Sequence, residues 1–210
     1  MSDCTAIDIL FNPDDATLAR AREVNARLRQ SIPDGFALDD THVPHITVLQ
    51  RYVRTADLDE VLGSVENTVR AADTAELTLH AIAIRHVDWG GRGGTVFQLT
   101  PNPPVLDFQA RLLTAVTPYA ESSGTPSAFV TDEDGAGINQ TTLDWVEHYV
   151  PNQIDTQYIA HLTLGFAPLD DLEVIEAAPF EPFEVSPTSV AVYHLGNNGT
   201  ARTQLRAWTL

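Results

Sequence analysis

Two short segments of the chain repeat one pattern, His-x-Thr-x, at residues 45–48 (HITV) and 161–164 (HLTL). In both segments the second and fourth residues are aliphatic. This alternation predicts a β-strand with the histidine and threonine on one face and the aliphatic side chains on the other. If two such strands lie together, two imidazoles and two hydroxyls surround one small space. That set of groups is suited to phosphoester chemistry.

The polar side chains of the repeat are the predicted catalytic residues, namely His45, Thr47, His161 and Thr163. Imidazole has an unperturbed pKa of about 6.5, so one ring can take a proton while the other donates one. The threonine hydroxyls are donors for the non-bridging oxygens of a phosphate. Such a pair predicts a bell-shaped dependence of rate on pH. A single His-x-Thr segment is common by chance, but two copies in similar frames favour paired catalysis.

The segments around the repeat alternate between strand and helix patterns. A strand is predicted at residues 4–11. The run from Asn12 to Asp15 offers a cap, a proline and acids for a helix that ends near Ser31. The tripeptide at residues 197–199 (NNG) predicts a hairpin. Further helices are predicted at 55–72, 104–121, 140–149 and 169–177, and further strands at 76–89, 95–99, 183–195 and 200–210.

Two polar loops carry patterns that resemble ligand sites. The glycine cluster at residues 90–94 lacks the Lys-Ser/Thr of a phosphate-binding P-loop, so it is interpreted as a hairpin loop. The acidic run at residues 132–137 lies in a loop-like stretch and lacks the glutamate that closes a calcium loop. We interpret it as a mobile acidic loop that does not bind a metal.

This order of elements predicts an α+β fold. Frequent hairpins favour mixed or antiparallel sheets. The two motifs are separated by a little over half of the 210 residues, which is the spacing expected of two structurally related lobes. We therefore predict a single bilobal domain over residues 1–210 in which each lobe supplies one His-x-Thr motif.

In these motifs the chain resembles the two-histidine (2H) phosphoesterase superfamily, which includes the 2′-5′ RNA ligase-like proteins and cyclic nucleotide phosphodiesterases. Residues 190–202 also resemble the closing strands of its RNA ligase-like members. The resemblance implies a bilobal α+β fold with a pseudo-twofold axis and a central cleft. It also implies that His45 and His161 are the acid–base pair and that Thr47 and Thr163 orient the phosphate, without a metal or cofactor.

Four further residues are candidates for substrate binding. Arg51, just past the first motif, and Arg202 could hold a phosphate through two parallel hydrogen bonds. Tyr158, three residues before the second motif, and Tyr193 could stack on a nucleobase. The alternatives are solvated surface positions for the arginines and core or rim packing for the tyrosines.

The charge of the chain bears on its partners. The formal net charge is −17, and all 12 basic residues are arginine. Long nucleic acids bind mainly through cationic side chains that neutralise phosphates, so this surface repels them. An acidic proteome is an alternative explanation of the charge. In either case a small cyclic-phosphate nucleotide or a short RNA end is a better ligand than a long nucleic acid.

The remaining composition suggests an intracellular enzyme. A lone cysteine, Cys4, excludes an intramolecular disulfide and a cysteine-based zinc site. No apolar run approaches the roughly 20 residues that span a bilayer, and the first residues lack the pattern of a signal peptide. We expect a cytoplasmic monomer with no membrane partner.

The favoured function is metal-independent hydrolysis of a cyclic (2′,3′-type) or 2′-5′-linked phosphodiester on a nucleotide or short RNA end. One alternative is RNA 2′-5′ ligation, the reverse reaction. Another is a binding module that holds a nucleotide or phosphorylated metabolite without turnover. Because both histidines are intact, an enzyme is favoured, and the lysine-free acidic composition ranks ligation of structured RNA below hydrolysis.

Overall fold

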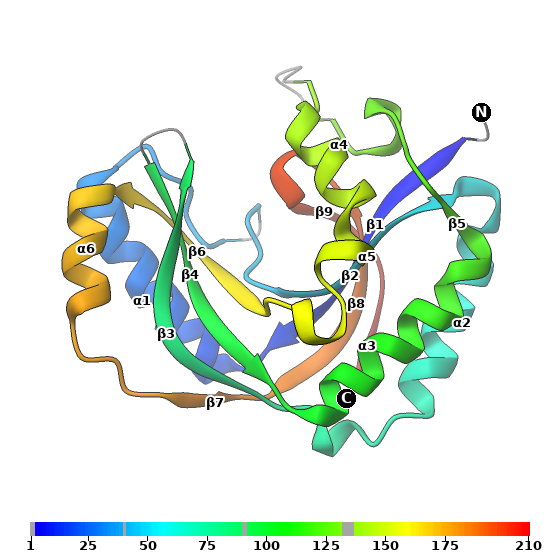
Figure 1. Ribbon diagram of the computed structural model, residues 1–210, viewed down its shortest axis with the longest axis horizontal. Coiled ribbons are helices and arrows are strands. Elements are labelled where there is room, and N and C mark those ends of the chain that lie inside the picture. Colours follow the sequence, from blue (N-terminus) through cyan, green and yellow to red (C-terminus); the bar gives the residue numbers. More distant parts are fainter. Residues whose placement is uncertain (1–2, 40, 90–91, 132–136) are drawn as a thin grey trace.

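The computed structural model describes residues 3–39, 41–89, 92–131 and 137–210. Two β-sheets with helices packed around them form an α+β fold of two lobes (Figure 1). Every described strand pair is antiparallel. The predicted fold class is thus confirmed, with antiparallel rather than mixed sheets.

Each sheet carries one of the two motifs. The first has the order β5-β2-β1-β8-β9 and the second the order β6-β4-β3-β7. The first motif leads into β2, and the second begins β6. The strands are β1 (Cys4–Pro13), β2 (Ile46–Arg54), β3 (Leu79–Trp89), β4 (Arg92–Pro101), β5 (Ala120–Glu121), β6 (His161–Pro168), β7 (Phe183–Val185), β8 (Pro187–Leu195) and β9 (Ala201–Thr209).

Helices pack on both sheets, and two of them cross between the lobes. Helix α1 (Asp15–Ser31) follows β1 of the first sheet but packs against β6 of the second. Helix α3 (Pro103–Val116) follows β4 of the second sheet but packs against β2 of the first. The largest buried cluster therefore contains side chains from both sheets. The other helices are α2 (Leu58–Arg70), α4 (Gln140–Glu147), α5 (Tyr149–Asn152) and α6 (Leu169–Ala177).

Both motif segments alternate as predicted. The aliphatic residues Ile46, Val48, Leu162 and Leu164 are fully buried. The histidines are half-buried, and Thr163 is exposed. The hairpin at residues 197–199 is also confirmed, because the amide of Gly196 bonds to the carbonyl of Thr200 across it at 2.8 Å.

Three of the element boundaries that differ from prediction have a local cause. Asp14 caps α1 by accepting from the Thr17 amide at 2.8 Å, whereas Pro13 ends β1 and lies outside the helix. Helix α3 stops at Val116 instead of residue 121, because Pro118 has no N–H to continue the hydrogen-bond ladder. The strand expected at 183–195 is split between the two sheets before Pro187, which likewise cannot donate to a ladder.

Some expectations concern parts that fall outside the described residues. The tip of the glycine loop, residues 90–91, and most of the acidic loop, residues 132–136, are among these. The residues that flank the glycine loop pair as a hairpin, with Trp89 opposite Arg92. Among the helices of the described residues, none is long and apolar enough to cross a membrane.

Candidate active site

The two motif histidines are held in the same way. The Nδ1 atom of His45 lies 2.7 Å from the carbonyl oxygen of Val43, and the Nδ1 atom of His161 lies 2.8 Å from that of Ile159. A carbonyl oxygen only accepts, so Nδ1 carries the hydrogen in both rings. In the neutral form, Nε2 is therefore the basic nitrogen of each ring. Both halves of the site thus offer Nε2 for proton transfer.

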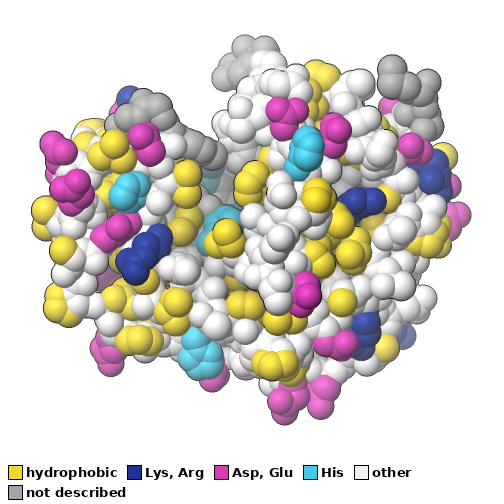
Figure 2. Space-filling view, viewed as in Figure 1, with side chains coloured by type: hydrophobic (Ala, Val, Ile, Leu, Met, Phe, Trp, Pro, Cys, Tyr) yellow, Lys and Arg dark blue, Asp and Glu magenta, His cyan; other side chains and the backbone are white. Residues whose placement is uncertain are grey.

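The fold brings the two motifs together. The hydroxyl of Tyr158, three residues before His161, donates to the carbonyl oxygen of Thr47 at 2.7 Å. Burial lowers the pKa of His161, its bond to Ile159 raises it, and the charge of nearby His45 lowers it again. Figure 2 shows histidine surface in the hollow between the two lobes. The two imidazoles therefore share one environment, and burial favours the neutral form of His161.

A buried carboxylate lies directly behind the first motif. Asp8 on β1 is fully buried, and its Oδ2 atom accepts from Thr47 Oγ1 at 2.8 Å and from Gln50 Nε2 at 3.0 Å. His45 Nε2 lies 3.7 Å from the same oxygen. Burial raises the pKa of Asp8, while the charge of His45 and the two hydrogen bonds lower it. The other oxygen, Oδ1, has no hydrogen-bond partner within the described residues.

Sequence reasoning missed Asp8. Its one signal was a carboxylate within the otherwise apolar run at residues 6–11 (AIDILF), where a charge is costly unless it is partnered. The antiparallel register places Asp8 opposite Gln50 on β2 and opposite Tyr193 on β8. These partners come from distant parts of the sequence.

The two motif threonines are in different environments. The Thr47 hydroxyl has a single proton, and that proton is donated to Asp8. Thr163 is exposed on β6, in register with Val96 of β4. In this arrangement Thr163 is the motif hydroxyl that can donate to a phosphate without first breaking a bond to a carboxylate.

The structure does not bring Arg51 to the motif residues. It is paired with Ile7, one position away from the Asp8–Gln50 pair, and successive residues of a strand point to opposite faces. Burial lowers the pKa of its guanidinium. Its position on β2 is therefore on the face away from Asp8, and the sequence pattern could not show this.

The other three candidates for substrate binding have packing partners. The aliphatic stem of Arg202 on β9 occupies the space beside Gly196 where a Cβ atom would lie. The rings of Tyr158 and Tyr193 are buried, and the hydroxyl of Tyr193 donates to Gln204 at 3.0 Å. Both tyrosines belong to the walls around Asp8, an environment that favours packing over stacking on a base.

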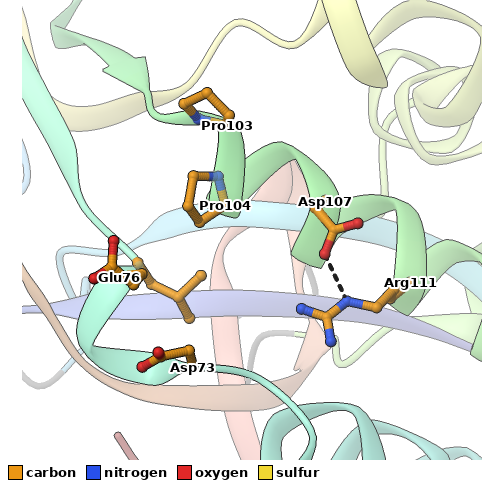
Figure 3. A pocket seen from close by; sticks show the side chains of 7 residues that line it. Asp73, Glu76, Pro103, Pro104, Asp107 and Arg111 are labelled. Atoms are coloured by element: carbon orange, nitrogen blue, oxygen red, sulfur yellow. Dashed lines mark ion pairs between the residues drawn. The ribbon is translucent and has the colours of Figure 1, made fainter.

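A separate hollow lies between the end of α2 and the start of α3 (Figure 3). Its one arginine, Arg111, is paired with Asp107 at 2.9 Å, so three carboxylates and one compensated cation face it. That balance is unsuited to a phosphate. The hollow is lined by Asp73, Glu76, Leu77, Pro103, Pro104, Asp107 and Arg111.

Within the described ranges no three His, Cys, Asp or Glu side chains are grouped to hold a metal ion.

Comparison with known proteins agrees with this architecture. A sequence model of the 2′-5′ RNA ligase superfamily matches residues 13–199. The crystal structure of TT0787 of Thermus thermophilus has a TM-score of 0.57 at 14% identity, covering 98% of each chain, so the two share a fold. Escherichia coli LigT complexed with 3′-AMP gives a TM-score of 0.48 at 15% identity, covering 100% of this chain and 99% of that one. No curated protein matches the sequence.

Proposed function

The chain belongs to the 2′-5′ RNA ligase superfamily, and from this premise we propose that it is a phosphodiesterase. Its substrate is a cyclic (2′,3′-type) or 2′-5′-linked phosphodiester of a nucleotide or a short RNA end. The observation that carries the proposal is the matched pair of imidazoles, each with Nδ1 bonded to a carbonyl and Nε2 left for proton transfer.

The reaction is hydrolysis by paired acid and base. The Nε2 atom of one histidine takes a proton from water as the water oxygen bonds to phosphorus. The bond from phosphorus to a ribose oxygen breaks, and the Nε2–H of the other histidine protonates that leaving oxygen. The hydroxyl of Thr163 donates to a non-bridging oxygen and stabilises its developing charge. The product is a phosphomonoester, and both histidines return to their starting forms by exchange with solvent.

The charge of the protein supports a small substrate. With a net charge of −17 and no lysine, the surface offers little neutralisation to a polyanion. Figure 2 shows acidic side chains spread over one face, with only small basic patches among them. A nucleotide or a short RNA end has few phosphates to repel, so it can enter the hollow between the lobes.

The test is turnover of 2′,3′-cyclic nucleotides in the presence of EDTA. We expect His45→Ala and His161→Ala each to lower kcat by at least about 100-fold, since each ring carries one proton transfer. His80→Ala is the matched control, because His80 is an exposed histidine of β3 outside the motifs. Turnover by the double variant His45→Ala/His161→Ala that equals turnover by the wild type would contradict the proposal. Tight binding without turnover by the wild type would instead assign a binding module, and joining of RNA ends in place of hydrolysis would assign the reverse reaction.

A further inference from the structure

The face of the second sheet that carries the second motif also carries an arginine that the proposed reaction does not use. We propose that this residue, Arg85 on β3, binds a second phosphate group of the substrate, one on which the two histidines do not act. The inference rests on the proposed function and deepens it, because it requires a substrate with at least two phosphates. A cyclic mononucleotide that has a single phosphate would leave Arg85 without a ligand.

Helices α1 and α6 cover the same face of the second sheet. A Cβ atom added to Gly93 would meet Leu172 of α6, and a Cβ atom added to the second glycine, in β6, would meet Leu28 of α1. That second glycine, Gly165, is paired with Thr95, which lies two residues from Gly93 on β4, so both glycines face the same way. The opposite face is therefore the one that these two helices leave open.

Arg85 lies on the open face, in line with the second motif. Thr163 is paired with Val96 of β4, and Val96 is paired in turn with Arg85 of β3. Because Val96 follows Thr95, this row of three side chains points away from the helices. Neighbouring strands are about 4.8 Å apart, so two such spacings place the Cα atoms of Thr163 and Arg85 roughly 10 Å apart. Both residues are exposed, so a substrate whose reacting phosphate contacts Thr163 can extend over Val96 to Arg85.

The charge of the open face is opposite to that of the whole chain, which is −17. Where β3, β4 and β6 lie side by side, the described residues of this face include the cations Arg85 and Arg92 and no carboxylate. Asp88 of β3 is three positions from Arg85, so it belongs to the face that the helices cover. Glu184 of β7 shares the open face but lies at its far end, paired with His80. Figure 2 shows basic surface on the left lobe, to the side of the hollow. This part of the face is suited to an anion.

The guanidinium of Arg85 is available to a ligand. The side chain is exposed, and among the described residues it forms no ion pair. It donates to the carbonyl oxygen of Ile84, the residue before it, at 3.0 Å. The remaining N–H groups of its planar fork match the oxygens of a phosphate. By contrast, Arg54, Arg70 and Arg111 are each paired with a carboxylate.

The test compares three substrates in the wild type and in Arg85→Gln. They are a 2′,3′-cyclic mononucleotide, the same nucleotide with a 5′-phosphate, and a dinucleotide that ends in a 2′,3′-cyclic phosphate. We expect the ratio of kcat/KM on the dinucleotide to kcat/KM on the plain mononucleotide to fall about 10-fold in Arg85→Gln, mainly through KM. An equal fall for the 5′-phosphorylated nucleotide would assign the subsite to a terminal phosphate, and a fall for the dinucleotide alone would assign it to an internucleotide phosphate. Ratios that are unchanged for both larger substrates would overturn the inference.

Arg27→Gln is the matched control, because Arg27 is an exposed arginine of α1, the helix behind the sheet. The substitution makes the same change in net charge, and we expect it to leave both ratios as in the wild type. A fall in Arg27→Gln as large as that in Arg85→Gln would overturn the inference, since it would show an effect of net charge alone.

A second measurement needs no turnover. In calorimetric titrations, we expect the wild type to bind a dinucleotide with a 3′-phosphate more tightly than the corresponding 3′-nucleotide, and Arg85→Gln to remove most of that difference. Equal Kd values of the wild type and Arg85→Gln for the dinucleotide would overturn the inference. The two proposals are thereby separated: absence of turnover would refute the phosphodiesterase, and the binding data would still decide the role of Arg85.

Discussion

The hydroxyl of Tyr158 donates to the carbonyl oxygen of Thr47 at 2.7 Å, so that the segment entering β6 is joined to the first motif. Tyr158 belongs to the part of the chain that leads to His161, whereas Thr47 belongs to the strand that follows His45. The bond therefore links the two halves of the candidate active site. Thr47 lies in β2, Tyr158 lies just before β6, and the ring that carries the hydroxyl is buried.

Removing that hydroxyl tests how far the site depends on the link. We expect Tyr158→Phe to lower the free energy of unfolding by about 1–2 kcal/mol, since it leaves a buried carbonyl without its donor. We also expect kcat to fall more than KM rises, because the two histidines lose a shared support. Urea unfolding and steady-state kinetics measure the two effects. Tyr119→Phe is the control on a half-buried tyrosine outside the site, and identical behaviour of both variants would refute the prediction.

The two motif threonines should respond differently to the same substitution. Thr163→Val removes an exposed hydroxyl, and we expect kcat/KM to fall about 10- to 100-fold while the free energy of unfolding stays nearly unchanged. Thr47→Val removes a donor to the buried carboxylate of Asp8, and we expect a loss of about 1–3 kcal/mol in stability. Chemical denaturation and kinetics on both variants check this contrast. Equal stability losses would show that the environments do not differ as described.

Titration of Asp8 should contribute to the pH dependence of the free energy of unfolding. Burial raises the pKa of its carboxyl above the unfolded value of about 3.9, so in this window the native state binds more protons than the unfolded state. Asp8 therefore contributes stability at low pH that is lost as the pH rises through the native value, by up to about 1.4 kcal/mol per pH unit. Compared with wild type, Asp8→Asn should lack this decline in urea unfolding between pH 4 and 8. Parallel curves for the two proteins would contradict the direction of the shift.

The motif strands could be predicted because their information is local. Alternation of polar and aliphatic residues fixes which side chains share a face, and the buried Ile46 and Leu164 lie where that rule puts them. Helix caps and the hairpin at residues 197–199 depend on a few neighbouring residues, and these too agree within a few positions.

The relation between Asp8 and the first motif could not be predicted, because it depends on register between strands. A bulge in the β1–β2 ladder pairs Leu10 with Thr47 but Ile9 with Leu49, which leaves Val48 as an extra residue of β2. Beyond Val48, the alternation of side chains between the two faces of β2 is therefore shifted by one residue. That single extra residue turns Gln50 toward Asp8 and Arg51 away from it. A candidate such as Arg51, judged only by its nearness in sequence to His45, can thus be assigned to the wrong face.

The last prediction concerns Asn25 of α1, whose side chain bonds both the segment before the first motif and the strand of the second motif. Asn25 is buried, and its Nδ2 donates to the carbonyl of Leu164 at 2.8 Å and to that of Phe36 at 3.1 Å. Its Oδ1 atom accepts from the amide of Leu38 at 3.3 Å. One side-chain amide thus forms hydrogen bonds with backbone groups of the segment before His45 and of the strand that carries His161.

We expect Asn25→Ala to lower the free energy of unfolding by about 2–4 kcal/mol. The substitution leaves backbone groups of both segments without their hydrogen-bond partner and opens a space beside Gly165. The matched control is Asn67→Ala, an exposed asparagine of α2 for which we expect a change within about 0.5 kcal/mol. Urea unfolding of both variants gives the comparison. Because the lost bonds hold β6 and the segment that leads to the first motif, turnover of the surviving folded fraction should also decline. A stable, fully active Asn25→Ala variant would show that neither motif depends on this amide.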